Sequence, residues 1–159
     1  MSAARYWLMK SEPAECSIDD ALAAPNSTVP WTGVRNYQAR NFLRDQMKVG
    51  DGVLFYHSSC AQPGIAGIAQ VASKAYADPT QFDSRSKYFD PSSKPASPRW
   101  VLVDVRALRK TRLISIAELR SHKELADMLV LRRGNRLSIT PVSAKHWHAI
   151  TRRLLGAET

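Results

Sequence analysis

The alternation of apolar and polar positions along the chain predicts short strands mixed with short helices. Aromatic and β-branched residues favour strands, and glycine or proline ends each apolar run. We therefore expect strands over residues 5–10, 53–57, 64–71, 100–106 and 136–140. The small residues of the 64–71 run permit a bulge or a close approach of two backbones, as a barrel-like sheet requires.

Helix-capping residues followed by apolar positions at helical spacing indicate four helices. We expect them over residues 18–24, 37–47, 116–128 and 144–155, with Ser17, Asn36, Ser115 and Ser143 as their N-terminal caps. The resulting order, β-α-α-β-β-β-α-β-α, lacks a regular βαβ alternation and predicts an α+β fold.

A long segment, residues 76–99, has four prolines and no periodicity. A structureless insert of this length is usually functional or disordered, and its aromatic residues argue against disorder. These aromatic residues could anchor the loop to the core. They also alternate with basic residues, a mixture that suits unpaired bases. The residues concerned are Phe82, Tyr88 and Phe89 with Arg85, Lys87, Lys94 and Arg99.

The length of 159 residues and the apolar content of 44% fit one globular domain, which we place at residues 3–156. The longest apolar runs are too short to span a membrane, and residues 1–10 lack the features of a signal peptide. With only Cys16 and Cys60, a disulfide framework is not expected. These features predict an intracellular, cytoplasmic protein, or a nuclear one in a eukaryote, with no membrane partner.

The net charge of +9 is unevenly distributed along the chain. Residues 1–80 contain 7 basic and 7 acidic residues, whereas residues 81–159 contain 16 basic and 7 acidic residues. Such an excess attracts polyanions, of which nucleic acid is the commonest in a cell. A charge that only keeps the protein soluble is the alternative interpretation.

We find no residue set typical of an enzyme. Cys60 follows His57 by three residues, which on a strand places the two on opposite faces. His146 and His148 point about 200° apart on a helix and cannot share a metal. No glycine-rich phosphate loop or hydrolase motif is present. The sequence therefore predicts no catalytic residue, no metal and no cofactor.

Seven stretches in order resemble the EVE domain of the thymocyte nuclear protein family, within the PUA-like superfamily that also contains the YTH readers of methylated adenine. The stretches are residues 6–13, 31–41, 50–58, 78–83, 86–91, 98–100 and 134–138. The resemblance implies a PUA-like pseudo-β-barrel with surrounding helices and a pocket that accepts a single modified nucleobase. It implies no catalysis.

Carried over position by position, the resemblance implies a nucleobase site with two aromatic walls. Trp31 would be the first wall, unless it is a core tryptophan. Asn36 could be only a helix cap, and His57 only a residue of the rim. The expected nucleobase-binding residues are Lys10, Ser11, Trp31, Val34, Arg35, Asn36, Tyr56, His57, Ser58, Asp83, Tyr88 and Leu137, with Val34 and Leu137 lining a recess for a methyl group. The expected phosphate-binding residues are Arg85, Lys87, Arg99 and Arg136.

The sequence therefore predicts a monomeric module that recognises a modified base in DNA or RNA. Two alternatives from other classes stay open. An enzyme acting on modified nucleotides would need a carboxylate beside the flipped nucleotide, for which Asp83 is the candidate. An aromatic cage that binds a peptide or methylated lysine is the other, and the positive charge of the chain disfavours it.

Overall fold

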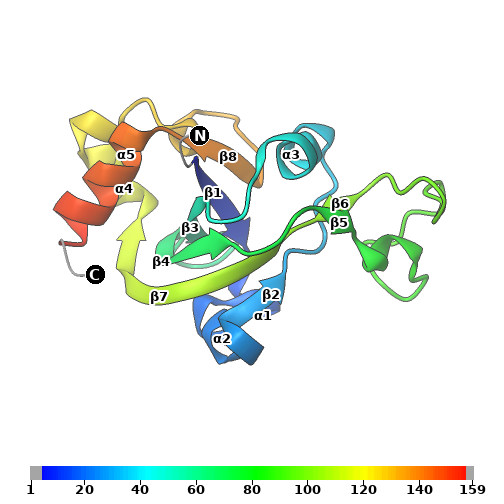
Figure 1. Cartoon of the computed structure of the whole chain (residues 1–159). Coiled ribbons are helices and arrows are strands. Elements are labelled where there is room, and N and C mark those ends of the chain that lie inside the picture. The colour runs from blue at the N-terminus through cyan, green and yellow to red at the C-terminus, as the bar shows by residue number, and fades with distance from the viewer. Residues whose placement is uncertain (1–4, 157–159) are drawn as a thin grey trace.

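A six-stranded sheet lies at the centre of the computed structural model, which describes residues 5–156 (Figure 1). The strands pair in the order β2-β7-β4-β3-β1-β8, and β5 and β6 form a separate two-stranded ribbon. Strands β1 to β8 cover Tyr6–Ser11, Thr28–Pro30, Gly52–His57, Gly64–Val71, Tyr76–Ala77, Val101–Leu102, Asp104–Ser115 and Ile139–Val142. Strands β1 and β3 run parallel, whereas the other neighbouring pairs are antiparallel.

Five short α-helices surround the sheet. Helices α1 to α5 cover Pro13–Cys16, Ile18–Ala23, Tyr37–Asn41, Ile116–Ser121 and Ala144–His148. Helices α3 and α5 each continue as π-helix, over residues 42–46 and 149–154 respectively. In Figure 1, α1 and α2 lie below the sheet, and α4 and α5 lie together at its left end.

Both faces of the central strands are buried. On β1, Trp7 and Met9 belong to one apolar cluster, and Leu8 between them belongs to the other. The same alternation on β3 places Phe55 in the first cluster and Tyr56 in the second. A strand covered on both faces is expected to be apolar at consecutive positions, which explains the unbroken run from residue 53 to residue 56.

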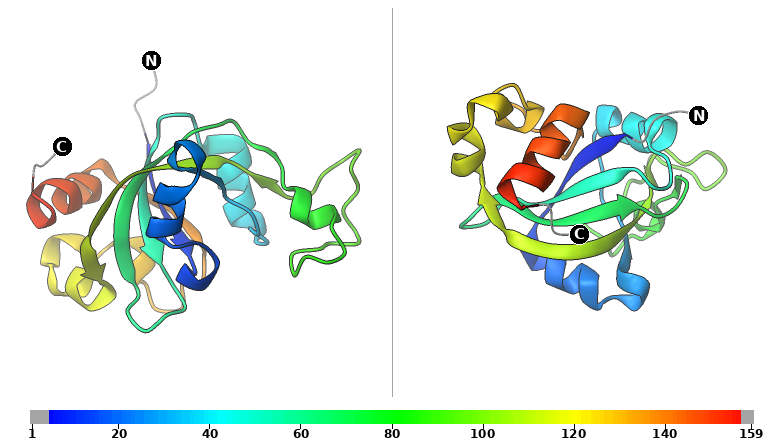
Figure 2. Two further views of the ribbon diagram at one scale, coloured as in Figure 1. Left: turned by 90° about the horizontal axis from the view of Figure 1, so that it is seen from below. Right: turned by 60° about the vertical axis from the view of Figure 1, so that its left-hand side comes forward.

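The segment of residues 78–99 extends away from the sheet, as the left view of Figure 2 shows. Its polar anchor is Gln81, whose side chain is fully buried. The Gln81 amide donates to the carbonyl oxygens of Asp78 and Trp100, both at 2.7 Å, and its oxygen accepts from the Ser93 hydroxyl at 2.6 Å. The segment is therefore ordered by its own buried hydrogen bonds.

The α+β prediction is confirmed, as are the N-terminal caps. Ser17 and Asp20 form a reciprocal capping box, and the Asn36 side chain accepts from the backbone N–H of Ala39. The strand expected at 64–71 has the predicted bounds.

Several predicted bounds are wrong. The strand expected at 100–106 is divided between β6 and β7, and β7 continues to Ser115 because its polar positions alternate along an exposed face. The helix expected to reach Met128 ends at Ser121, and two single 3₁₀ turns at 123–125 and 129–131 follow. The strand expected at 136–140 begins only at Ile139.

The strand β2 lies in a stretch predicted to be loop, and β5 begins the segment predicted to lack structure. Strands of two or three residues are too short for a periodic pattern to reveal. The start of the expected domain, residue 3, lies outside the described residues.

We predict that Asp51→Ala lowers the free energy of unfolding by about 3 kcal/mol, because it leaves buried donors without a partner. The Asp51 side chain accepts from the Trp7 indole N–H at 3.0 Å and from the backbone N–H groups of Lys48 at 2.9 Å and Arg5 at 3.2 Å. Urea denaturation measures the loss. Asp51→Asn retains one acceptor for Trp7 and should lose clearly less, and equal losses would contradict this role.

Candidate functional site

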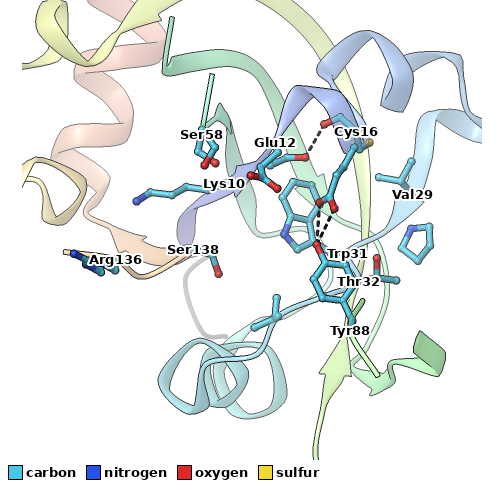
Figure 3. Close-up of a pocket in the computed structure, with 16 residues that line it drawn as sticks. Lys10, Glu12, Cys16, Val29, Trp31, Thr32, Ser58, Tyr88, Arg136 and Ser138 are labelled. Atoms are coloured by element: carbon cyan, nitrogen blue, oxygen red, sulfur yellow. Dashed lines mark hydrogen bonds between the residues drawn. The ribbon is translucent and has the colours of Figure 1, made fainter. Parts of the chain in front are cut away.

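A pocket with a volume of about 530 Å³ opens beside the carboxyl ends of β1 and β3 (Figure 3). Because the two strands are parallel, Ser11 and His57 end them side by side, and Ser58 N–H donates to the Ser11 carbonyl at 2.9 Å. The lining residues come from five segments: Lys10, Ser11, Glu12, Glu15, Cys16, Val29, Pro30, Trp31, Thr32, Gly33, Val34, Ser58, Ser59, Tyr88, Arg136 and Ser138.

Trp31 forms one aromatic wall and also belongs to the core. Only 8% of its surface is exposed, and its ring meets Phe55 edge-to-face with centroids 5.3 Å apart. Its backbone N–H donates to the Val103 carbonyl at 3.0 Å. The indole is therefore held rigidly while it lines the pocket.

Tyr88, from the long segment, forms a second aromatic wall. Gly33 has a positive φ of 87°, and a Cβ at this position would lie 2.5 Å from the Tyr88 ring. Glycine thus allows both the turn and the close approach of the ring. The Tyr88 hydroxyl donates to the Glu15 carboxylate at 2.9 Å, and Lys87 forms an ion pair with the same carboxylate.

The electrostatics of this contact shift two pKa values in opposite directions. Burial, together with the hydrogen bond to Glu15, raises the pKa of Tyr88 above its ordinary value. The hydrogen bond from Lys87 lowers the pKa of Glu15. At neutral pH the hydroxyl is therefore a donor and the carboxylate is an acceptor, which ties the long segment to α1 across the pocket (Figure 3).

Arg35 fixes the position of Tyr88 from behind. Its Nε and Nη2 donate to the Tyr88 carbonyl at 3.1 and 2.8 Å, and Nη1 donates to the carbonyl of Val34 at 2.9 Å. The remaining donors reach Asp78 Oδ2 at 3.1 Å and Thr80 Oγ1 at 3.0 Å. A guanidinium has five N–H groups, so none is left for a ligand.

Asp78 joins the segment to the loop that carries Trp31. Its carboxylate is fully buried and accepts from Gly33 N–H at 2.8 Å, from Arg35, and from the backbone and hydroxyl of Thr80 at 2.8 and 2.5 Å. A buried carboxylate is stable only when its oxygens are satisfied in this way. This network sets the distance between the two aromatic walls.

The opposite side of the pocket is polar and carries two unpartnered charges. Within the described chain, the side chains of Lys10 and Glu12 make no hydrogen bond or ion pair, although both line the pocket. Partial burial lowers the pKa of Lys10. Ser58, Ser138 and the exposed Arg136 lie on the same side (Figure 3). The arrangement offers aromatic surface on one side and hydrogen-bonding groups on the other.

The structure brings seven of the predicted site residues to this pocket: Lys10, Ser11, Trp31, Val34, Ser58, Tyr88 and Arg136. Nine others do not line it: Arg35, Asn36, Tyr56, His57, Asp83, Leu137, Arg85, Lys87 and Arg99. Of the two open interpretations of the loop aromatics, the geometry gives Tyr88 the position of a wall, whereas Phe89 is exposed and does not line the pocket.

The residues outside the pocket have structural contacts instead. Asn36 caps α3, and Tyr56 is buried in the second apolar cluster. The His57 Nε2 accepts from the backbone N–H of Ile18 at 3.1 Å. The exposed Asp83 accepts from the backbone N–H of Arg85 at 2.9 Å, within its own turn, and Leu137 is half-buried beside the rim.

Two of the predicted phosphate-binding residues are neutralised within the chain. Lys87 pairs with Glu15, and Arg99 pairs with Asp90 at 3.3 Å. Asp90 also accepts from the indole N–H of Trp100 at 2.7 Å. Arg85 is exposed on the surface of the loop.

The sequence interpretation missed Glu12, Glu15 and Gly33. Glu12 directly follows the predicted Lys10 and Ser11 at the strand end, so its position was a usable signal. Gly33 lies in a turn that needs a positive φ. A glycine two residues after Trp31 is a sequence signal for such a turn. The contact of Glu15 with Tyr88 joins residues 73 positions apart, and no local pattern reveals it.

Both cysteines are free. Cys60 is exposed, and burial raises the pKa of Cys16, which keeps its thiol protonated. Among residues 5–156, no group of His, Cys, Asp and Glu side chains is arranged to hold a metal ion. In the same range, no helix has the length and apolar character needed to cross a bilayer.

The family model described as EVE domain matches residues 5–153. Thymocyte nuclear protein 1 of Danio rerio is 45% identical over 162 residues, which cover 91% of this chain and 69% of that protein. A solved structure described as human THYN1 protein in complex with 5-methylcytosine containing DNA is 42% identical, with a TM-score of 0.90, and the match covers 98% of this chain and all of that chain (100%).

A more distant structure shows the likeness of fold alone. The YTH domain of the Zygosaccharomyces rouxii MRB1 protein, in complex with N6-methyladenosine RNA, is 14% identical, with a TM-score of 0.56 over 100% of this chain and 88% of that chain. The predicted PUA-like fold is thereby confirmed. None of these three proteins is described as an enzyme.

We predict that His57 makes the stability of the fold depend on pH. Burial lowers the pKa of His57 below 6.5, and the neutral ring accepts a hydrogen bond from the backbone N–H of Ile18. The unfolded chain takes up the proton first, so the contribution is present above pH 6.5 and is lost as the pH falls through the lowered pKa. Thermal melts between about pH 7.5 and 5 measure the loss.

His57→Gln is the matched control, because a glutamine oxygen can accept the same hydrogen bond without titrating. The variant should melt with a shallower dependence on pH over this range. A dependence identical to that of the wild type would show that His57 does not cause it.

Proposed function

The chain belongs to the EVE domain family, as its seven sequence stretches predicted, and we propose that it binds nucleic acid carrying a modified nucleobase, which enters the pocket lined by Trp31 and Tyr88. The proposal rests most heavily on one observation. Two rigidly held aromatic side chains line the pocket, and they face Lys10 and Glu12, whose charged side chains have no partner in the described chain.

The size and chemistry of the pocket fit a single base. Its volume of about 530 Å³ lies within the range of roughly 300–1,000 Å³ typical of small-molecule sites. Stacking on an aromatic ring contributes about 1–3 kcal/mol per base, whichever base is bound. A base extruded from a duplex, or already unpaired, would insert between the walls.

The proposed contacts divide between the faces and the edge of the base. Trp31 and Tyr88 stack on its faces. Lys10 and Ser58 supply donors for ring nitrogen and carbonyl acceptors, since an ammonium and a hydroxyl can both donate. The Ser11 hydroxyl donates to the Cys16 carbonyl at 2.6 Å and offers its oxygen as an acceptor. Val34, which is 4% exposed, lines the pocket and offers an apolar surface for a methyl group.

The relatives support this choice of ligand. The human relative, 42% identical over nearly the whole chain, was solved with DNA that contains 5-methylcytosine. The charge of +9 suits a polyanionic partner, and the basic Lys10 and Arg136 at the pocket disfavour a cationic ligand such as methylated lysine. We infer an intracellular location, nuclear in a eukaryote, where such a partner is found.

We propose recognition without catalysis. Asp83, the one carboxylate considered for base removal, is exposed and does not line the pocket. Of the carboxylates that line the pocket, Glu15 is engaged by Tyr88 and Lys87. Glu12 has no partner within residues 5–156, and we assign it to accept a hydrogen bond from an amino group of the base. A binding role accounts for the aromatic walls without a general base.

The proposal is tested by titrating labelled oligonucleotides that differ only in one base: 5-methylcytosine against cytosine, and N6-methyladenine against adenine. Fluorescence anisotropy should show tighter binding to one modified member of a pair. Tyr88→Leu, which removes the ring, should weaken that binding by about 5- to 150-fold, the equivalent of 1–3 kcal/mol.

Tyr88→Phe is the control for that variant. It retains the ring and its contact with Gly33 but loses the hydroxyl that donates to Glu15. Its discrimination between modified and unmodified bases should stay within about threefold of the wild type if stacking is the main contribution. Equal binding of all bases by the wild type would refute the proposed function.

We also predict that prolonged incubation with the preferred oligonucleotide releases no base and leaves its mass unchanged. Mass spectrometry of the recovered oligonucleotide measures this directly. Turnover that disappears in Asp83→Asn would establish the enzyme instead.

A further inference from the structure

A basic turn, residues 132–136, lies at the rim of the pocket. The backbone N–H of Asn135 donates to the Arg132 carbonyl at 3.1 Å, and Gly134 has a positive φ of 81°. The Asn135 side chain donates to the Leu129 carbonyl at 2.6 Å and accepts from Leu137 N–H at 2.9 Å. Local hydrogen bonds therefore hold the backbone of the turn, and this fixes the positions from which the arginine side chains extend.

The three arginines of the basic turn are all exposed, and none has an acidic partner. Within residues 5–156, the side chains of Arg132, Arg133 and Arg136 form no ion pair or hydrogen bond. The sequence has no Asp or Glu between Asp127 and Glu158 that could neutralise them locally. Three like charges on one short turn repel each other, and an anion would relieve that repulsion.

Other basic residues of the second half of the chain are already paired. Lys87 and Arg99 pair with Glu15 and Asp90, and Arg112 donates to Glu118 at 2.8 Å. The positive charge that remains uncompensated therefore belongs to residues without an acidic partner, such as the arginines of the basic turn.

The basic turn is continuous with the pocket. Arg136 lines the pocket, and the Ser138 carbonyl two residues later accepts from the backbone N–H of Lys10 at 2.8 Å. Figure 3 shows Arg136, Ser138 and Lys10 on the side of the pocket opposite Tyr88. A strand whose base enters the pocket would have its phosphates within reach of this rim.

We propose that the basic turn binds the phosphodiester backbone next to the inserted base, with Arg136 nearest the pocket and Arg132 and Arg133 on neighbouring phosphates. The inference rests on the proposed function, which it extends from the base to the backbone. Guanidinium groups suit this task because their planar donors match two phosphate oxygens at once. The contacts add affinity independently of the base sequence.

The first experiment measures how affinity depends on salt. In Arg132→Gln/Arg133→Gln, the slope of log K against log[salt] should become less negative by about 2, one unit for each phosphate contact. The ratio of affinities for modified and unmodified oligonucleotides should not change, because neither arginine lines the pocket. An unchanged slope would overturn the inference.

The control variant, Arg120→Gln/Lys123→Gln, removes the same charge from exposed positions of α4 and the turn after it. It should leave the slope nearly as in the wild type. If it changes the slope as much as the variant of the basic turn does, the effect comes from net charge and the inference fails.

A second experiment locates the phosphate. Neutral methylphosphonates are placed singly on either side of the modified nucleotide. Wild type should lose affinity at each contacted position. The Arg132→Gln/Arg133→Gln variant should lose nothing further at the positions that Arg132 and Arg133 contact, whereas the position that Arg136 contacts should stay sensitive. Losses that simply add would show that the arginines bind elsewhere.

The two proposals fail in different ways. If the wild type does not discriminate between modified and unmodified bases, the proposed function is refuted, whatever the salt slope. Retained discrimination with an unchanged slope in the double variant refutes only the role of the basic turn.

Discussion

The buried carboxylate of Asp78 is the contact on which the geometry of the pocket depends. It receives the backbone of Gly33, the guanidinium of Arg35 and the backbone and side chain of Thr80. One side chain thus joins the loop behind Trp31 to the start of the segment that carries Tyr88. Because all these groups are satisfied internally, the walls are held before any ligand arrives, and less ordering is required on binding.

The charge of the molecule acts through its distribution as well as its sum. Acidic residues of the first half, such as Glu15 and Asp19, are paired with Lys87 and Lys110 of the second half. These pairs are exposed, so each adds little to stability. Their larger effect is to cancel charge on parts of the surface, so that the positive potential remains at positions such as the basic turn.

The sequence predicted those parts of the structure that local physics determines. The caps at Ser17 and Asn36 need only neighbouring residues. The strand at 64–71 shows its burial as a run of apolar and small residues that only Gln70 interrupts. The full length of β7 was not predicted, because its exposed positions are mostly basic. Arg35 was expected to meet a base, whereas four of its five donors are used by partners 43 to 53 residues away. Hydrogen bonds between residues so far apart in the sequence produce no recognisable spacing of residue types.

The contact between Gly33 and Tyr88 restricts how this chain can change over generations. With an aromatic ring at position 88 lying on the backbone at 33, any side chain at 33 displaces that ring. A smaller residue at 88 would free position 33 of the steric conflict, but the positive φ would still favour glycine. Drift at the two positions is therefore ordered, since the ring must be replaced before the glycine. A descendant with a different residue at position 88 and a side chain at position 33 is therefore reached by changing position 88 first.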